Sequence, residues 1–283
     1  MPPAAVPDMP PAAVPDTPGR RAAVLGSPIA HSRSPQLHLA AYRALGLPSW
    51  RYDRIECTGE QLPGLVGALG PEWVGLSVTM PGKFAALRVA DQRTERAELV
   101  GSANTLVRLP TGGWRADNTD VDGVMGALGS TAETAVVIGS GGTAPAAVVA
   151  LAELGARRIV VAARDGGKAA RLVDLAGHCG VQGEWCDLGG EGLARVAADA
   201  GVAVSTIPAD AAAGYATTLA AVPRLLDAIY DPWPTPLAAA VEAAGGEVIN
   251  GLQMLLHQAF AQVRQFTGMP APEEAMRAAL AGP

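Results

Sequence analysis

The sequence predicts an α/β protein built from two consecutive units, each of which alternates strands with helices. Short apolar runs and helical patterns alternate from residue 21 onward, and a second series of the same kind begins near Thr134. In the second series the strands are apolar throughout, which is typical of parallel strands covered by helices on both faces. The 283 residues are also enough for about two domains, each with its own core.

The first unit opens with a predicted strand at "RRAAVLG" and a helix over residues 35–45. Ser34, which precedes a proline, is predicted to cap this helix, and Gly46 to end it. The next elements are a strand at "WRYDRIEC", a helix at "EQLPGLVGALG", a strand at "EWVGLSVT" and a helix at "PGKFAALRVA". A strand pair, "ANTLVRL" and "GGWRA", joined by a turn at "TGG", closes the unit.

The second unit has six predicted strands, "TAVVIG", "RRIVVAAR", "VQGEWCD", "VAVSTI", "RLLDAIYD" and "EVIN". The helices between them are predicted at "APAAVVALAELG", "GKAARLVDLAG", "GLARVAADA" and "PLAAAVEAAGG". A long amphipathic helix, "NGLQMLLHQAFAQVRQFTG", and a shorter one at "PEEAMRAAL" end the chain. We expect the long helix to return and pack on the first unit.

The N-terminal segment repeats the motif "PPAAVPD" at residues 2–8 and 10–16. It has no basic leader and no continuous apolar region, so it is not interpreted as a signal peptide. Its proline content is too high for a helix. Residues 1–19 are therefore predicted to form a disordered, polyproline-like tail.

Composition excludes several classes of function. The net charge of -6, without a basic patch, argues against a nucleic-acid partner. No apolar run approaches the length of a membrane span. Cys57, Cys179 and Cys186 are scattered along the chain, which indicates reduced thiols in a cytoplasmic protein. The four histidines lack metal-ligand spacing, so no metal site is predicted.

The turn "IGSGGTA" follows a predicted strand and opens a helix, with Gly139, Gly141 and Ala144 in the spacing G-x-G-x-x-G/A. In this spacing the first glycine makes a tight turn and the second lets the backbone approach a pyrophosphate. The small third residue lets the helix pack on the strand. The turn therefore predicts dinucleotide binding, and the alternative is a plain strand–helix turn.

The end of the next strand indicates which dinucleotide. Ala163 stands where an NAD site usually carries an acidic residue, and Arg164 and Lys168 follow it. A guanidinium pairs well with phosphate oxygens, so these cations favour the 2′-phosphate of NADP. Asp165 is the complication, because a carboxylate directed at that phosphate would repel it.

Polar residues gather at the predicted strand ends of the first unit. Ser32 and Ser34 lie before a helix, whose N-terminus favours an anion; the alternative is a solvated, capped loop. Lys83 in "SVTMPGK" and Asp120 in "DNTD" are candidates for the proton transfer that accompanies hydride transfer at an alcohol carbon. The alternatives for these two are a surface lysine and a helix cap.

Eight motifs, in this order and spacing, resemble the shikimate dehydrogenase family from about residue 24 to residue 266: "PIAHSRSP", "SVTMPGK", "ANTL", "DNTD", "IGSGGTA", "STIP", "YDPWPTPL" and "GLQMLLHQA". The resemblance implies reversible, NADPH-dependent reduction of 3-dehydroshikimate to shikimate in aromatic amino acid biosynthesis, by a monomer or homodimer. It implies a substrate-binding catalytic domain over residues 20–121 and a Rossmann-like NADP-binding domain over residues 122–249. Residues 250–283 are then helices that pack back on the substrate domain.

The resemblance also implies roles for individual residues. Ser32 and Ser34 would bind the substrate carboxylate, Lys83 would handle the proton, and Asp120 would fix the lysine and a substrate hydroxyl. The other substrate-binding residues are implied to be Thr79, Asn104, Tyr230 and Gln258. The cofactor-binding residues are implied to be Gly139, Ser140, Gly141, Gly142, Thr143, Ala144, Arg164, Lys168, Thr206, Gly251 and Met254.

The chain departs from the family pattern at three places. Many members have Asn at the position of Ser77 and a bulkier residue at that of Gly82, and "AAR" replaces an asparagine–arginine–threonine sequence. Two alternatives stay open. An NAD-using quinate/shikimate dehydrogenase would be favoured by an acidic residue at position 163. A non-catalytic dinucleotide-binding or regulatory protein would be marked by loss of Lys83 or Asp120.

Overall fold

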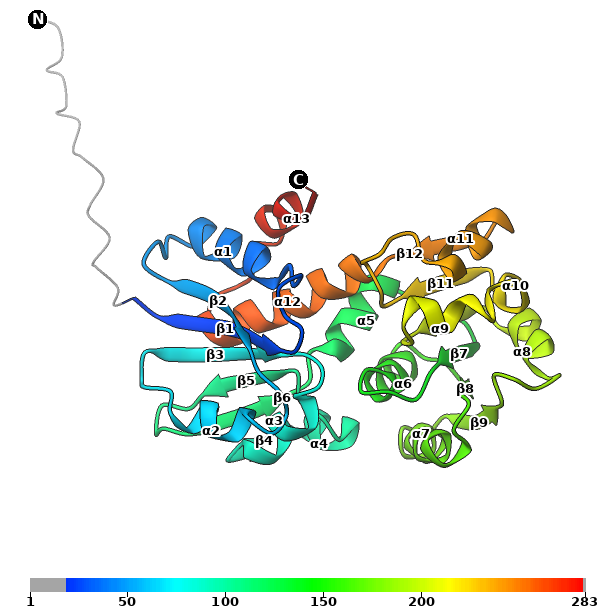
Figure 1. Ribbon diagram of the computed structural model, residues 1–283, viewed down its shortest axis with the longest axis horizontal. Coiled ribbons are helices and arrows are strands. Elements are labelled where there is room, and N and C mark those ends of the chain that lie inside the picture. The colour runs from blue at the N-terminus through cyan, green and yellow to red at the C-terminus, as the bar shows by residue number, and fades with distance from the viewer. Residues whose placement is uncertain (1–18, 282–283) are drawn as a thin grey trace, which may run out of the picture.

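The computed structural model describes residues 19–281, so the tail predicted over residues 1–19 lies, except for its last residue, outside the described part. Two six-stranded sheets lie side by side (Figure 1). Helix α5 (Asp120–Leu128) leads the chain from the first sheet to the second, and α12 (Gly251–Thr267) brings it back. Across residues 19–281, no helix is long and apolar enough to cross a membrane.

The first sheet has the strand order β2-β1-β3-β5-β6-β4. β1 runs parallel to β2 and β3, whereas β5 runs antiparallel to β3 and β6, so the predicted strand pair is confirmed. Its strands are β1 (Arg21–Gly26), β2 (Arg51–Glu56), β3 (Trp73–Val78), β4 (Gln92–Arg93), β5 (Thr105–Arg108) and β6 (Trp114–Asp117). The helices among them are α1 (Ser34–Ala44), α2 (Leu62–Gly67), α3 (Lys83–Val89) and α4 (Glu95–Val100).

The second sheet is entirely parallel, in the order β12-β11-β10-β7-β8-β9. Its strands are β7 (Thr134–Ile138), β8 (Arg158–Ala162), β9 (Gln182–Cys186), β10 (Val202–Ser205), β11 (Arg224–Asp227) and β12 (Glu247–Ile249). The helices are α6 (Ala144–Glu153), α7 (Gly166–His178), α8 (Leu193–Asp199), α9 (Ala209–Ala213), α10 (Ala216–Leu219) and α11 (Pro236–Ala243). Strand order reverses between β7 and β10, and in doubly wound sheets ligands bind beyond the carboxyl ends at such a point.

Apolar side chains cover both faces of this second sheet, as the all-apolar strands predicted. One cluster joins β7 and β8 to α5, α6 and α7, and the other joins the opposite face to α8–α11. The first cluster includes Met254 of α12, so the returning helix shares a core with the second sheet.

Helices α5 and α12 pack side by side, which small residues permit. A Cβ on Gly123 would lie 2.8 Å from the Met254 carbonyl oxygen and 3.2 Å from the Gln258 Cβ, and one on Gly126 would overlap the His257 ring. At its other end α12 packs on α1, β3 and β5, and α13 (Glu273–Ala281) packs on α1 (Figure 1). The predicted return of the closing helix to the first unit is thus confirmed.

The cap prediction for Ser34 is wrong. Arg33 occupies the N-cap position without a side-chain cap, and Ser34 is the first helical residue. The Ser34 N–H donates to the Ser32 Oγ at 3.3 Å. A turn in which the Ser32 N–H donates to the Ile29 carbonyl places Ser32 beside the first turn of the helix. Gly46 follows the helix at φ 71°, so the predicted end is confirmed.

The sequence prediction omitted β4, α4, α9 and α10. These elements have two to six residues, too few for a periodic apolar pattern to identify. α4 nevertheless carries a local signal, since the Thr94 Oγ1 accepts the Ala97 N–H at 3.1 Å and Gly101 follows the helix at φ 72°.

Candidate active site

A cavity of about 170 Å³ brings together polar residues from both ends of the chain. All eight residues predicted for catalysis or substrate binding line it: Ser32, Ser34, Thr79, Lys83, Asn104, Asp120, Tyr230 and Gln258. Three residues predicted for the cofactor, Thr143, Gly251 and Met254, line it as well. The cavity therefore joins the end of the first sheet to the glycine turn of the second.

Lys83 and Asp120 form a buried ion pair in this cavity. The lysine Nζ lies 2.5 Å from Asp120 Oδ2, and each side chain is 9% exposed. Lys83 begins α3 directly after the β3 turn, and Asp120 begins α5 after β6, so both project from the carboxyl ends of strands. The lysine Nζ also donates to the Thr143 Oγ1 of the glycine turn at 3.3 Å. The pair thus stands where the two sheets meet.

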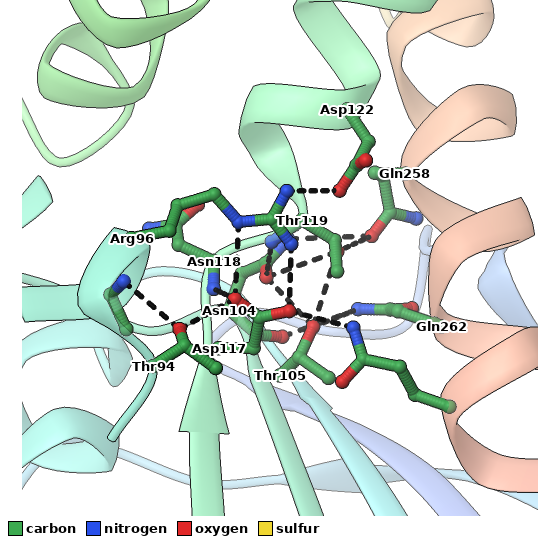
Figure 2. Close-up of polar contacts among 12 residues, drawn as sticks. Thr94, Arg96, Asn104, Thr105, Asp117, Asn118, Thr119, Asp122, Gln258 and Gln262 are labelled. Atoms are coloured by element: carbon green, nitrogen blue, oxygen red, sulfur yellow. Dashed lines mark hydrogen bonds and ion pairs between the residues drawn. The ribbon is translucent and has the colours of Figure 1, made fainter.

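Asn104 fixes the other oxygen of the carboxylate. Its Nδ2 donates to Asp120 Oδ1 at 2.9 Å, and its Oδ1 accepts the Thr119 N–H at 2.7 Å and the Thr105 hydroxyl at 2.8 Å. Gln258 reaches this group from α12, where its Oε1 lies 3.4 Å from Asn104 Nδ2 (Figure 2). Asp120 is therefore held in one orientation, with Lys83 on one oxygen and Asn104 on the other.

The serine pair lies at the start of α1. Ser32 and Ser34 are 6% and 4% exposed, and the Arg54 guanidinium donates to the Ser32 carbonyl at 2.8 Å. The Ser32 Oγ accepts the Ser34 N–H through a lone pair, and Ser32 lines the cavity, where its hydroxyl can donate its proton. Hydroxyl donors beside a helix N-terminus are suited to a carboxylate.

The glycine turn has an open face. Gly139 adopts φ 108°, which a residue with a Cβ rarely does, and a Cβ there would meet the Thr206 Oγ1 at 2.7 Å. A Cβ on Gly141 or Gly142 would meet no heavy atom within 4 Å. These two glycines are not required for packing within the described chain, and the space beside them fits a phosphate group close to the backbone.

Arg164 and Lys168 lie outside the cavity, exposed just beyond the carboxyl end of β8. Asp165 caps α7, since its Oδ1 accepts the Lys168 N–H at 3.0 Å, and this bond, with the nearby lysine charge, lowers the pKa of Asp165. The other carboxylate oxygen, Oδ2, lies 3.6 Å from the Lys168 Nζ, so Asp165 pairs with this cation, while Arg164 and Lys168 both remain exposed. Ser140 and Ala144 complete the turn, where Ala144 is fully buried at the start of α6.

Two groups beside the cavity were missed from the sequence. Arg96 of α4 donates to both oxygens of Asp117 (Nε–Oδ1 3.1 Å, Nη2–Oδ2 2.7 Å) and pairs with Asp122 (Nη1–Oδ2 2.8 Å) beside the start of α5 (Figure 2). The second group joins Tyr52, Ser77 and Gln262. Both groups are joined by long-range contacts without a local motif. The sequence signals were the threonine cap of α4 and the glutamine at position 262, four residues after Gln258 on the same face of the closing helix.

Within residues 19–281, no three histidine, cysteine or acidic side chains gather to hold a metal ion. The described site is built instead from hydrogen-bond donors, an ion pair and a glycine turn.

Fold and site define a two-domain α/β oxidoreductase that uses a pyridine dinucleotide. Comparison with known proteins identifies the family: residues 24–106 match the shikimate dehydrogenase substrate binding domain, and residues 251–281 match the shikimate 5′-dehydrogenase C-terminal domain. The shikimate dehydrogenase (NADP(+)) of Methylobacterium radiotolerans is 38% identical over 261 residues, which cover 84% of this chain and 88% of that protein. The chain belongs to the shikimate dehydrogenase family.

Solved structures agree. The shikimate 5-dehydrogenase of Mycobacterium fortuitum is 78% identical, with a TM-score of 0.86 over 98% of this chain and 99% of that one. The shikimate dehydrogenase of Mycobacterium tuberculosis is 72% identical, with a TM-score of 0.90 over 93% of this chain and 99% of that one.

Proposed function

We propose that the chain catalyses the reversible reduction of 3-dehydroshikimate to shikimate with NADPH. One observation carries the proposal: a single cavity is lined by the Lys83–Asp120 pair, by the serine pair and by Thr143 of the glycine turn. A small acid with ring hydroxyls can bind there, with its carboxylate at the serine pair and its hydroxyls at the Lys83–Asp120 pair, next to the glycine turn. Family membership supports the same reaction.

We divide the chain accordingly. Residues 20–121 form the substrate-binding domain, completed by residues 250–283, and residues 122–249 form the NADP-binding domain. The packing of α12 on β3 and β5 and the glycine turn after β7 support this division.

Lys83 is the proton donor and acceptor in this proposal. Bound NADPH supplies the hydride, and the Lys83 Nζ gives a proton to the carbonyl oxygen of the substrate during reduction. Asp120 holds the ammonium through its Oδ2 and accepts the Asn104 amide through its Oδ1, and its carboxylate is placed to accept from a neighbouring ring hydroxyl. In the oxidation direction Lys83 takes the hydroxyl proton.

The remaining polar residues orient the ring. Ser32 and Ser34 bind the carboxylate, and a charge-assisted hydrogen bond to it contributes about 1.5–3 kcal/mol. Tyr230, from the loop after β11, is half-buried in the cavity wall, and Thr79 and Gln258 complete the contacts with the ring.

We assign NADP to the open face of the glycine turn. The residues fit, because Gly141 and Gly142 leave room for the phosphates and Met254 and Gly251 lie at the cavity beside them. Arg164 and Lys168 would hold the 2′-phosphate, with the Asp165 carboxylate engaged by the Lys168 N–H at the start of α7 and by the Lys168 ammonium. We further propose a cytoplasmic enzyme that acts as a monomer or homodimer.

The test is a set of initial rates with shikimate and with quinate, each with NADP⁺ and NAD⁺. Activity confined to shikimate with NADP⁺ is the expected result. Comparable rates with quinate and NAD⁺ would move the chain to the broader quinate/shikimate activity. No turnover in any combination, with cofactor binding retained, would favour a non-catalytic protein.

A further inference from the structure

A chain of buried hydrogen bonds lies behind the cavity and takes no part in the chemistry proposed above. The Tyr52 hydroxyl donates to the Ser77 Oγ at 2.6 Å, and the Ser77 hydroxyl donates to the Gln262 Oε1 at 2.6 Å. The three side chains come from β2, β3 and α12, and each residue is at most 5% exposed. Ser77 and Gln262 also line the cavity.

The surroundings of Gln262 decide which end of its amide faces Ser77. Its Nε2 lies 3.3 Å from the Asn104 backbone oxygen and 2.9 Å from the Thr105 Oγ1 (Figure 2 shows Gln262 beside Thr105). A backbone carbonyl can only accept, so this end must be the NH₂ group. The oxygen end therefore faces Ser77, and the single hydroxyl proton of Ser77 is committed to it.

The neighbouring side chains of His38 and Tyr52 are consistent with this assignment of hydrogen-bond donors and acceptors. The His38 Nε2 lies 3.3 Å from the same Gln262 oxygen, and burial lowers the pKa of His38 to about 3, so the ring is neutral and donates from Nε2. His38 stacks on Tyr52 with ring centres 4.0 Å apart. Burial raises the pKa of Tyr52, and the hydrogen bonds with Ser77 and Ser34 oppose this shift only in part, so the Tyr52 hydroxyl keeps its proton and donates it to Ser77.

We propose that Gln262 is a positioning residue that, through Ser77, makes this wall of the cavity an obligate hydrogen-bond acceptor for a substrate hydroxyl. The inference rests on the proposed function, since it concerns how that substrate is oriented. Ser77 retains one lone pair for the cavity and no proton. It favours a ring hydroxyl and disfavours a carboxylate, whereas Ser32 has a proton to donate. Ser77 and Ser32 thus offer opposite hydrogen-bond polarity to the substrate, which is bound in one orientation.

The first experiment compares Gln262→Leu with Gln265→Leu. Gln265 lies on the same helix and donates to Asp117 Oδ2 at 2.7 Å, so its variant also removes a partly buried amide, outside the cavity. We expect Gln262→Leu to raise the KM for shikimate about 10-fold, with kcat changed less than about 3-fold and the KM for NADP⁺ unchanged. Gln265→Leu should leave both KM values unchanged. An unchanged shikimate KM in a folded Gln262→Leu variant overturns the proposal.

The second experiment tests whether Gln262 acts through Ser77. The KM for shikimate of Ser77→Ala should equal that of the double variant with Gln262→Leu, because the second change has no hydroxyl left to orient. Multiplied effects overturn the proposal. Ser77→Ala also tests the proposal if Gln262→Leu does not fold, because the proposal requires Ser77→Ala by itself to raise the KM for shikimate.

The third experiment tests the proton direction. Shikimate analogues in which one non-reacting hydroxyl is replaced by fluorine keep an acceptor but lose the donor. One of them should bind the unchanged protein about 10-fold more weakly than shikimate, yet bind Ser77→Ala no more weakly than shikimate does. Absence of this coupling for every analogue refutes the acceptor assignment. Turnover of shikimate by the unchanged chain tests the proposed function separately, so either can fail alone.

Discussion

The substrate side and the cofactor side of the site are built in opposite ways. On the substrate side, Asn104, Asp120 and Gln262 are buried, and their side-chain hydrogen bonds hold them in single orientations. On the cofactor side the turn at Gly141 and Gly142 faces open space, and Arg164 is exposed. The substrate side therefore presents a rigid set of side chains to a small ring, whereas the cofactor side presents backbone groups and two exposed cations to the dinucleotide.

This difference has an energetic consequence. Removing one member of the buried set leaves its partners unsatisfied, which costs more than the hydrogen bond itself contributed. Removing a surface cation leaves only water in its place. Variants on the two sides should differ in both size and kind of effect.

Lys83→Ala should cause the largest loss. We expect kcat to fall by about 10²–10⁴, because the proton donor is gone, while the KM for NADP⁺ changes little. NADPH absorbance gives the rate. Lys168→Ala is the matched control, since Lys168 is the other lysine of the chain and should affect only the KM for NADP⁺. Wild-type turnover in Lys83→Ala would remove this lysine from the mechanism.

Arg96→Leu should have the largest effect on stability. Arg96 neutralises Asp117, whose side chain is 6% exposed, and Asp122. Loss of the guanidinium leaves both carboxylates without their cation, so we expect the free energy of unfolding at pH 7 to fall by about 3 kcal/mol. Urea unfolding measures the change. A loss below about 1 kcal/mol would show that the cluster contributes little to stability.

The same variant gives a pH dependence. Burial alone would raise the pKa of Asp117, but the hydrogen bonds and charge of Arg96 lower it. In the wild type, the ionised Asp117 therefore contributes to the free energy of unfolding at pH values above its pKa in the unfolded chain, near 4. This contribution is lost as the pH falls through the lower pKa of Asp117 in the folded protein. In Arg96→Leu the pKa of Asp117 rises, and protonation relieves the buried charge. The difference in free energy of unfolding between the wild type and Arg96→Leu should decrease from pH 7 to about pH 4. A difference that does not change with pH would contradict this account.

Gly123→Ala tests the close packing of α5 on α12, the two helices that connect the substrate and cofactor sides. The added methyl would lie 2.8 Å from the Met254 carbonyl oxygen, so α12 must move. We expect about 1–3 kcal/mol of destabilisation and a higher KM for shikimate, because Gln258 moves with the helix. Gly177→Ala in α7 is the control: no heavy atom lies within 4 Å, and helix propensity makes it neutral or slightly stabilising. Equal unfolding midpoints for the two variants would refute the close-packing argument.

Arg164→Ala should have the smallest effect. We expect the KM for NADP⁺ to rise about 10-fold while the KM for NAD⁺ and for shikimate stay the same, since an exposed guanidinium contributes through the 2′-phosphate alone. Initial rates at varied cofactor concentration give these values. A parallel rise for NAD⁺ would place Arg164 elsewhere on the cofactor.

The sequence predicted the parts of the molecule that local patterns encode. The apolar strands from Thr134 onward define the parallel sheet. Polar motifs at strand ends supply Ser32, Ser34, Thr79, Lys83, Asn104 and Asp120, and the family resemblance adds Tyr230 and Gln258; all of these line the cavity. Motifs of this kind can be recognised because each depends on residues within a few positions of one another.

What the sequence did not predict depends on distant partners. Ser77 meets Gln262 across 185 positions, and Gln265 meets Asp117 across 148, so no spacing rule links them. The cap at Ser34 failed for a related reason: the preceding turn, and not the residue type, decides which serine faces the first turn of α1.

The chain crosses between its two halves at two places, and both touch the cavity. Asp120 begins the outgoing helix, and the returning helix begins at Gly251 and carries Met254 and Gln258. In any rotation of one half against the other, points near the crossings move least and distant points move most. The reacting groups therefore lie close to the axis of any such rotation, whereas Arg164, which follows β8 and lies outside the cavity, moves farther.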